Sequence, residues 1–299
     1  MMLTFSRYVR TFLLTITLLT VVLPAAANEQ IVLQRTNKPC TAILFDIGGV
    51  LAKINTFSLI HALGCGHLCS YSLTAFTSPL ALREKMQYTL DYLAQRDGIG
   101  AHPENAIVLD GRPIPLFMQE WQKGTNTCHE VETYVLQAIA ELKKKKCFTN
   151  KREVRLVKKL AHCLIDAPMH CSLDKLIQPM FESLKKIKSQ NPQIKLIIAS
   201  NMPPEQAAAF RKQFPELVAL FDDAIFSGEI GYAKPETEFF THILAKHALN
   251  PATTLFVDNE KPNIKAAQKI GLKTFYIHDN NFAEFESFLV RQTMLAFVR

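Results

Sequence analysis

Residues 42–50 read Ala-Ile-Leu-Phe-Asp-Ile-Gly-Gly-Val, an apolar run that reaches Asp46 and then passes through two glycines, Gly48 and Gly49. A short, continuous apolar run followed by glycines is typical of a strand that is buried on both faces. The paired glycines indicate tight backbone geometry near a ligand, because glycine lets the main chain approach closely. We therefore predict that Asp46 ends a buried strand and belongs to a functional site.

Further apolar segments of the same kind return late in the chain. They predict strands at 194–199, 223–226, 254–258 and 273–277, with helices at about 204–213, 235–248, 260–270 and 281–297. Continuous apolar strands separated by helices indicate a parallel sheet covered on both faces. The predicted fold class is therefore α/β, a three-layer Rossmann-like core. Right-handed crossovers place the carboxyl ends of its strands on one edge, where ligands bind.

The long segment between the first strand and the rest of the sheet has a different pattern. Residues 53–191 are mostly helical in pattern, and the predicted core is then made of residues 41–52 and 192–299. A segment inserted at this point predicts a helical cap domain over the strand ends, and its short linkers would allow it to move. Its helices are predicted at 83–95, 114–123, 129–146, 151–165 and 173–190.

A polar side chain that could take part in catalysis or ligand binding follows each of the first four predicted strands. Individually these residues are weak signals, but their order along one sheet edge is more specific. A carboxylate that attacks a phosphoryl group needs a metal ion to reduce the repulsion between two anions. It also needs cationic and hydroxyl groups that hold the transferring oxygens. In chain order the polar residues are Asp46, Ser200 with Asn201, Lys234 before Pro235, and Asp258 with Asn259.

Four short motifs together resemble those of the haloacid dehalogenase-like hydrolase superfamily. They are FDIGGV (45–50), IIASN (197–201), AKPE (233–236) and FVDNEKPNIKAA (256–267). The resemblance covers the predicted core, and the position of the insertion resembles the helical C1 cap of that superfamily. It implies a Mg²⁺-dependent phosphatase, a phosphoric monoester hydrolase that acts on a small phosphorylated metabolite through an aspartyl-phosphate.

The resemblance also implies a role for each motif residue. Asp46 would be the nucleophile, and Ser200 and Lys234 would act with it in catalysis. The expected ligands of the Mg²⁺ ion are oxygen atoms, which suit that ion. The substrate-binding residues would be Ser200, Asn201 and Lys234, and the metal ligands Asp46, the main-chain carbonyl of Gly48, Asp258 and Asn259.

Two positions depart from the pattern of the superfamily. Gly48 stands where a second aspartate usually protonates the leaving group, and a positioned acid is worth ~10²–10⁴ in rate. Its loss favours substrates with good leaving groups, such as acyl or anomeric phosphates. Asn259 replaces a common second acid, so weaker metal binding is expected. Two alternatives stay open, namely a 2-haloacid dehalogenase-like enzyme and a non-catalytic binding protein with this fold.

The N-terminus has the charged, apolar and small-residue order of a secretory signal. Arg7 and Arg10 precede the apolar run Thr11–Leu23, and three alanines, 25–27, follow it. The run is short for a membrane span, which needs ~20 residues. We predict a signal peptide over residues 1–27, a secreted or periplasmic mature protein, and no stable membrane span after cleavage.

The composition and charge of the chain limit the classes of molecule that the protein is expected to bind. The chain has 34 basic and 27 acidic residues, and no aromatic–basic or zinc-finger pattern points to nucleic acid. The basic run Lys143–Lys146 is interpreted as a solvated helix end, with an electropositive rim for an anionic substrate as the alternative. The seven cysteines could pair in part in an oxidising compartment, with at least one left over.

Overall fold

The computed structural model describes residues 39–75, 80–98, 106–109, 112–278 and 281–293 of the 299. The predicted signal peptide, residues 1–27, lies outside these ranges. No helix within them is both long and apolar enough to cross a membrane.

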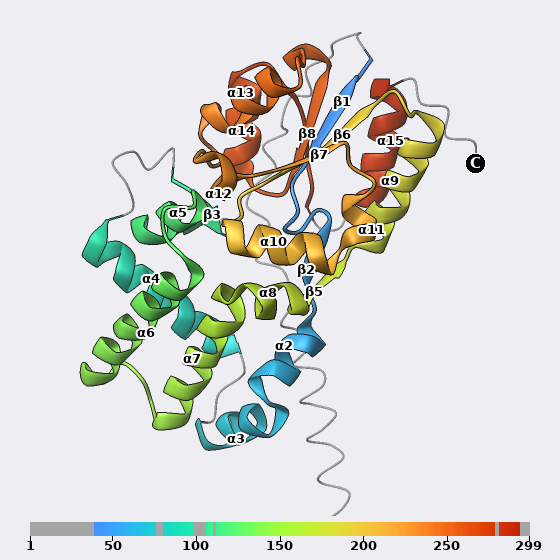
Figure 1. The fold of residues 1–299 in the computed structure, drawn as a ribbon. Coiled ribbons are helices and arrows are strands. Elements are labelled where there is room, and N and C mark those ends of the chain that lie inside the picture. The colour runs from blue at the N-terminus through green and yellow to red at the C-terminus, as the bar shows by residue number, and fades with distance from the viewer. Residues whose placement is uncertain (1–38, 76–79, 99–105, 110–111, 279–280, 294–299) are drawn as a thin grey trace, which may run out of the picture.

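The core is a five-stranded sheet in the order β7-β6-β1-β8-β9 (Figure 1). The central strand β1 pairs in parallel with β6 on one side and β8 on the other. The two outer pairs are also parallel, so all carboxyl ends share one edge. The strands agree with those predicted, within one residue at each end: β1 Ala42–Phe45, β6 Lys195–Ser200, β7 Asp223–Phe226, β8 Thr254–Asp258 and β9 Lys273–Tyr276.

Alternate residues of each strand point to opposite sides of the sheet. Because the central strands are apolar on both sides, helices cover both faces. In β1, Ile43 and Phe45 pack in one hydrophobic cluster, and Leu44 packs in another. The first cluster includes helices α9 (Gln178–Gln190), α10 (Pro204–Gln213), α11 (Pro215–Val218) and α15 (Phe282–Thr293). The second includes α13 (Thr237–Lys246) and α14 (Lys261–Lys269). The predicted three-layer α/β arrangement is confirmed.

Two short strands join the core to a helical unit below the sheet edge (Figure 1). Strands β2 (Ala52–Ile54) and β5 (Asp174–Leu176) pair antiparallel, so the chain leaves the core and returns to it side by side. We call residues 55–173 the helical insertion. It contains α2 (Thr56–Leu63), α3 (Cys65–Ala75), α4 (Leu80–Asp97), β3 (Val108–Leu109), β4 (Arg112–Pro113), α5 (Leu116–Gln122), α6 (Cys128–Lys144), α7 (Lys151–Ile165) and α8 (Ala167–Leu173).

The boundary predicted at residue 191 is wrong, because α9 belongs to the core. Its buried residues Met180, Leu184 and Ile187 pack in the same cluster as Ile43 of β1. Helical periodicity shows that a helix has an apolar face, but not which of two cores that face meets. The sequence also gave no prediction of α2, α3 and α8.

The insertion has a hydrophobic core of its own. Helix α7 buries Val154, Val157, Leu160 and Ala161 along one face, and the side chain of Asn150 caps its first turn. Helix α6 begins with a capping box between Thr127 and Glu130. All seven cysteines of the chain are free thiols, four of them buried: Cys40, Cys128, Cys163 and Cys171.

Candidate active site

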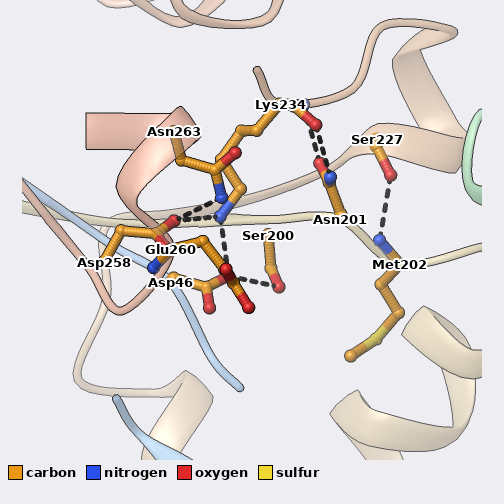
Figure 2. A network of polar contacts seen from close by, with 9 residues as sticks. All are labelled: Asp46, Ser200, Asn201, Met202, Ser227, Lys234, Asp258, Glu260 and Asn263. Atoms are coloured by element: carbon orange, nitrogen blue, oxygen red, sulfur yellow. Dashed lines mark hydrogen bonds and ion pairs between the residues drawn. The ribbon is translucent and has the colours of Figure 1, made fainter. Parts of the chain in front are cut away.

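Four of the predicted site residues come together at the carboxyl edge of the sheet (Figure 2). Asp46 directly follows β1, while Ser200 and Asp258 are the last residues of β6 and β8. Lys234 lies in the segment between β7 and α13. All four are nearly or fully buried, with Asp46 the most accessible at 8%.

The two carboxylate oxygens of Asp46 have different surroundings. Oδ1 accepts hydrogen bonds from Ser200 Oγ at 2.9 Å and from Lys234 Nζ at 2.7 Å. Oδ2 accepts none from the described residues, and a Cβ atom built on the exposed Gly48 would lie 3.8 Å from it. One oxygen is thus fixed by two donors, and the other lies beside the open turn.

The ammonium of Lys234 lies between two carboxylates. Besides Asp46 it contacts Asp258 Oδ2 at 2.8 Å, and the residue is only 1% exposed. Burial disfavours the charged amine, but Asp258 and Asp46 outweigh that effect, so the pKa of Lys234 is raised. The side chain is therefore a fixed cation within contact of the Asp46 carboxylate.

Asp258 is held by groups from its own loop and from α14. Its Oδ1 accepts the main-chain N–H of Glu260 at 2.7 Å, and its Oδ2 accepts Asn263 Nδ2 at 3.0 Å. Burial raises the pKa of the Asp258 carboxyl to about 6, and the charge of Lys234 opposes a larger rise. Asn263 was not among the predicted site residues, although it stands in the fourth motif, in the first turn of the helix after β8.

The side chain of Asn201 forms hydrogen bonds with the backbone of Lys234. Its Nδ2 donates to the Lys234 carbonyl at 2.8 Å, and its Oδ1 accepts the Lys234 N–H at 2.8 Å. The following peptide bond, Lys234–Pro235, is cis. The predicted substrate-binding role of Asn201 is thus accompanied by an observed one, which is to fix the main chain that bears the ammonium.

The turn after Asp46 requires glycine at residue 49. Gly49 has φ +74°, and a Cβ atom there would lie 2.7 Å from Nδ2 of Asn259. The Asn259 side chain therefore packs against this turn. Within the described residues it makes no hydrogen bond to either Asp46 or Asp258, which the sequence had grouped with it as metal ligands.

The donors at this edge fit a magnesium ion. No cluster of three or more His, Cys, Asp or Glu side chains suited to a metal occurs in the described ranges. Mg²⁺ does not require one, because it typically binds one or two carboxylates and completes its shell with waters and substrate phosphate. Asp46, Asp258 and the Gly48 carbonyl offer oxygen only, the ligand type that this ion prefers.

Comparison with known proteins gives a family match over most of the chain. A family model described as haloacid dehalogenase-like hydrolase matches residues 40–271. The sesquiterpene phosphatase astK of Aspergillus oryzae is 30% identical over 101 residues, which are 34% of this chain and 50% of that protein. The glyceraldehyde 3-phosphate phosphatase of Methanocaldococcus jannaschii is 35% identical over 81 residues, 25% of this chain and 36% of that protein. The matches thus span half or less of either relative.

A solved structure shares the fold. It is a dehalogenase crystal structure with an intermediate complex, and it has a TM-score of 0.50 and 15% identity to this chain. The alignment covers 81% of this chain and 87% of that one. At this identity the similarity concerns the fold alone.

Proposed function

The chain belongs to the haloacid dehalogenase-like hydrolases, and from this premise we propose that it is a Mg²⁺-dependent phosphatase that forms an aspartyl-phosphate on Asp46. The substrate would be a small phosphorylated metabolite. Two curated relatives that match part of the chain are phosphatases by name, which supports the choice of reaction.

The observation that carries the proposal is the asymmetry of the Asp46 carboxylate. A nucleophilic carboxylate must be held in place and must still present one oxygen to the substrate. Lys234 and Ser200 hold Oδ1, whereas Oδ2 lies beside the exposed Gly48. A carboxylate with a purely structural role would be expected to have both oxygens engaged.

The reaction then proceeds in two displacements. Asp46 Oδ2 forms a bond to phosphorus while the bond from phosphorus to the leaving oxygen breaks. Water next attacks the phosphorus of the acyl phosphate, which releases inorganic phosphate and restores the carboxylate. Lys234 and the Ser200 hydroxyl would steady the phosphoryl oxygens through both steps.

Bound Mg²⁺ would supply positive charge that reduces the repulsion between the carboxylate and the phosphoryl group. Asp46, Asp258 and the Gly48 carbonyl would hold it. The Asp258 carboxylate is already oriented for this purpose, because Glu260 N–H and Asn263 Nδ2 each donate to one of its oxygens.

The missing acid at position 48 points to substrates whose leaving group needs little protonation. With glycine there, the leaving oxygen receives no proton from the residue two positions after Asp46. Acyl and anomeric phosphates meet this condition better than simple alkyl phosphates do, since their leaving groups are more stable as anions.

A substrate panel tests the function. Protein covering residues 28–299 should hydrolyse acyl, anomeric and aryl phosphates with Mg²⁺ and be silent in chelator. Asp46→Asn should reduce kcat by at least ~10³, whereas Asp91→Asn, at a half-buried carboxylate of the helical insertion, should not change it. An unimpaired Asp46→Asn protein would exclude the nucleophile assignment. Turnover of 2-haloacids in chelator would instead favour a dehalogenase.

We also propose that the protein is exported. The support is the order Arg7, Arg10, the apolar run Thr11–Leu23 and the alanines 25–27. Sequencing the N-terminus of the mature protein should give Asn28 as its first residue. Cytosolic protein that retains its first 27 residues would contradict export.

A further inference from the structure

The helical insertion touches the core at a second place, far along the chain from its two linking strands. The contact is made by Gln122, the last residue of α5, together with Lys123 and Gly124, which follow it; we call Gln122–Gly124 the docking loop. It meets the core segment 227–236, the segment that contains Lys234. The contacts are of three kinds: a hydrogen-bond bridge, a close backbone approach and an ion pair.

Ser227 makes the hydrogen-bond bridge. This fully buried residue donates its hydroxyl to the Gln122 carbonyl. It also accepts the Met202 N–H at 2.9 Å, a bond that Figure 2 shows. Met202 directly follows Asn201, the residue that holds the Lys234 main chain. One hydroxyl thus connects the docking loop to the backbone of the candidate site.

A backbone contact beside this bridge leaves no room for side chains. Gly124 has φ +81°, and a Cβ atom there would lie 2.2 Å from the Gly228 carbonyl oxygen. A Cβ atom on Gly228 would lie 2.5 Å from Cδ of Pro204, at the start of α10. The docking loop and the core therefore meet main chain to main chain.

The ion pair joins Lys123 of the docking loop to Glu236 of the core. The Lys123 ammonium contacts Oε1 of Glu236, while Oε2 accepts the Ala233 N–H at 3.0 Å. Both charged side chains are mostly buried, at 24% and 22% exposure. Ala233, next to Lys234, is fully buried and packs in the hydrophobic cluster of the insertion rather than in that of the core.

We propose that Lys123 is a positioning residue for Lys234. Asn201 fixes the Lys234 main chain from the core side, and Glu236 fixes the preceding Ala233 N–H from the other side. Lys123 holds Glu236 in the orientation that accepts this N–H. The docked insertion therefore sets where the Lys234 ammonium lies between Asp46 and Asp258. The catalytic consequence rests on the proposed phosphatase function, whereas the positioning itself does not.

The physical basis is the flexibility of the lysine side chain. A long side chain keeps its ammonium in one place only if its own backbone is fixed and its partners lie close. Loss of the Lys123 charge leaves the Glu236 carboxylate mostly buried without its cation, which favours its movement toward solvent. The Ala233 N–H then loses its acceptor, and the Lys234 backbone is held from one side only.

The test uses the variants Lys123→Ala, Lys123→Arg and Glu236→Gln in the full mature chain. With Mg²⁺ and an aryl phosphate, Lys123→Ala should lower kcat by roughly 3- to 30-fold with little change in KM. Lys123→Arg, which keeps the charge, should restore most of the rate. The double variant Lys123→Ala/Glu236→Gln should be no slower than the worse single variant, because both remove the same pair.

Lys188→Ala is the matched control for the loss of an ion pair. Lys188 pairs with Asp222 at 2.7 Å, and its side chain has a similar exposure of 31%. Because this pair joins α9 to the start of β7, away from the docking loop, kcat should stay within about twofold of the original.

Amide hydrogen exchange provides a readout that needs no activity. In Lys123→Ala the Ala233 and Lys234 amides should exchange at least ~10-fold faster than in the unaltered protein. In Lys188→Ala their exchange should not change. If the unaltered protein hydrolyses no phosphate ester, the proposed function fails and the exchange result still decides the positioning role. Unchanged exchange in Lys123→Ala would overturn the inference whatever the activity.

Discussion

Gly48 lies at the most open point of the candidate site. It is exposed, its φ is not positive, and a Cβ atom on it would have only Asp46 Oδ2 within 4 Å, at 3.8 Å. A larger side chain therefore has room at this position without backbone strain. The absence of an acid there is a chemical feature of the site and does not follow from a lack of space.

This space leads to a prediction for Gly48→Asp. The new carboxyl should protonate poor leaving groups and raise kcat for alkyl phosphates by about 10- to 100-fold, below the ~10²–10⁴ of a fully positioned acid. Aryl phosphates should gain little, because their phenolate leaving groups depart readily as anions. Steady-state kinetics on both substrate classes measure the difference, with the isosteric Gly48→Asn as control. An equal gain in Gly48→Asn would show that the acid is not the cause.

At the scale of elements, the contact between the docking loop and α12 (Ser227–Ile230) depends on two glycines that touch. Gly124→Ala adds a Cβ atom that would clash with the Gly228 carbonyl, in addition to the cost of a positive φ. Gly231→Ala is matched to it, because Gly231 has φ +77° and no atom within 4 Å of the added Cβ. Gly124→Ala should destabilise the protein by about 2–4 kcal/mol and Gly231→Ala by about 1 kcal/mol. Urea denaturation provides the comparison, and equal losses would mean that the contact is not tight.

The linking strand β5 begins with an acid, Asp174, whose side chain is only 9% exposed. Burial raises the pKa of its carboxyl to about 7, and the neighbouring His170, whose pKa burial lowers, lies 4.0 Å away. The folded protein therefore holds a proton that the unfolded chain releases near pH 4. From this residue alone, stability falls as the pH rises from about 4 to about 7 and is level above that range.

Asp174→Asn removes this dependence. At about pH 8 the variant should be more stable than the unaltered protein by on the order of 2 kcal/mol, whereas near pH 4 the two should be similar. Urea denaturation at both pH values measures this. Asp91→Asn, at a side chain that is 47% exposed, should show no such difference. A gain for Asp174→Asn that is the same at both pH values would exclude titration as its cause.

At the scale of the whole molecule, the basic run Lys143–Lys146 lies far from the candidate site. Helix α6 has 17 residues and is about 25 Å long. Its first residue, Cys128, donates its N–H to Glu205 of α10 at 2.6 Å, whereas the lysines stand at its other end. The length of α6, which separates the lysines from the end that contacts α10, is about three Debye lengths at physiological salt, since one Debye length is about 8 Å. This arrangement favours the solvated helix end over a rim that attracts substrate.

Neutralising the run tests that interpretation. A variant with glutamine at all four positions should keep kcat/KM for an anionic phosphate ester within about twofold at low and at physiological salt. Lys234→Gln should in contrast abolish turnover. If the fourfold variant loses kcat/KM at low salt but not at physiological salt, the run acts as an electropositive rim that attracts the substrate.

The core could be predicted from the sequence because its signals are local. Each central strand is a continuous apolar run ending in a polar residue, so Asp46, Ser200 and Asp258 could be placed at one edge before any coordinates. The packing of α9 could not be predicted, because its apolar face fits either core. Lys123 and Ser227 were missed for a related reason: Ser227 binds a carbonyl 105 residues away, and nothing in its neighbourhood shows that.

The central position of β1 has a consequence for the order in which the chain can assemble. The strand is made well before its partners β6 and β8, which begin only at Lys195 and Thr254. The insertion is complete by residue 173, so it can gather most of its core while Asp46 still lacks its neighbours. Lys234 and Asp258 come last of the four. A chain interrupted before β6 would therefore contain the helical insertion and Asp46 but not Ser200, Lys234 or Asp258, and the candidate site can be complete only after β8 has been made.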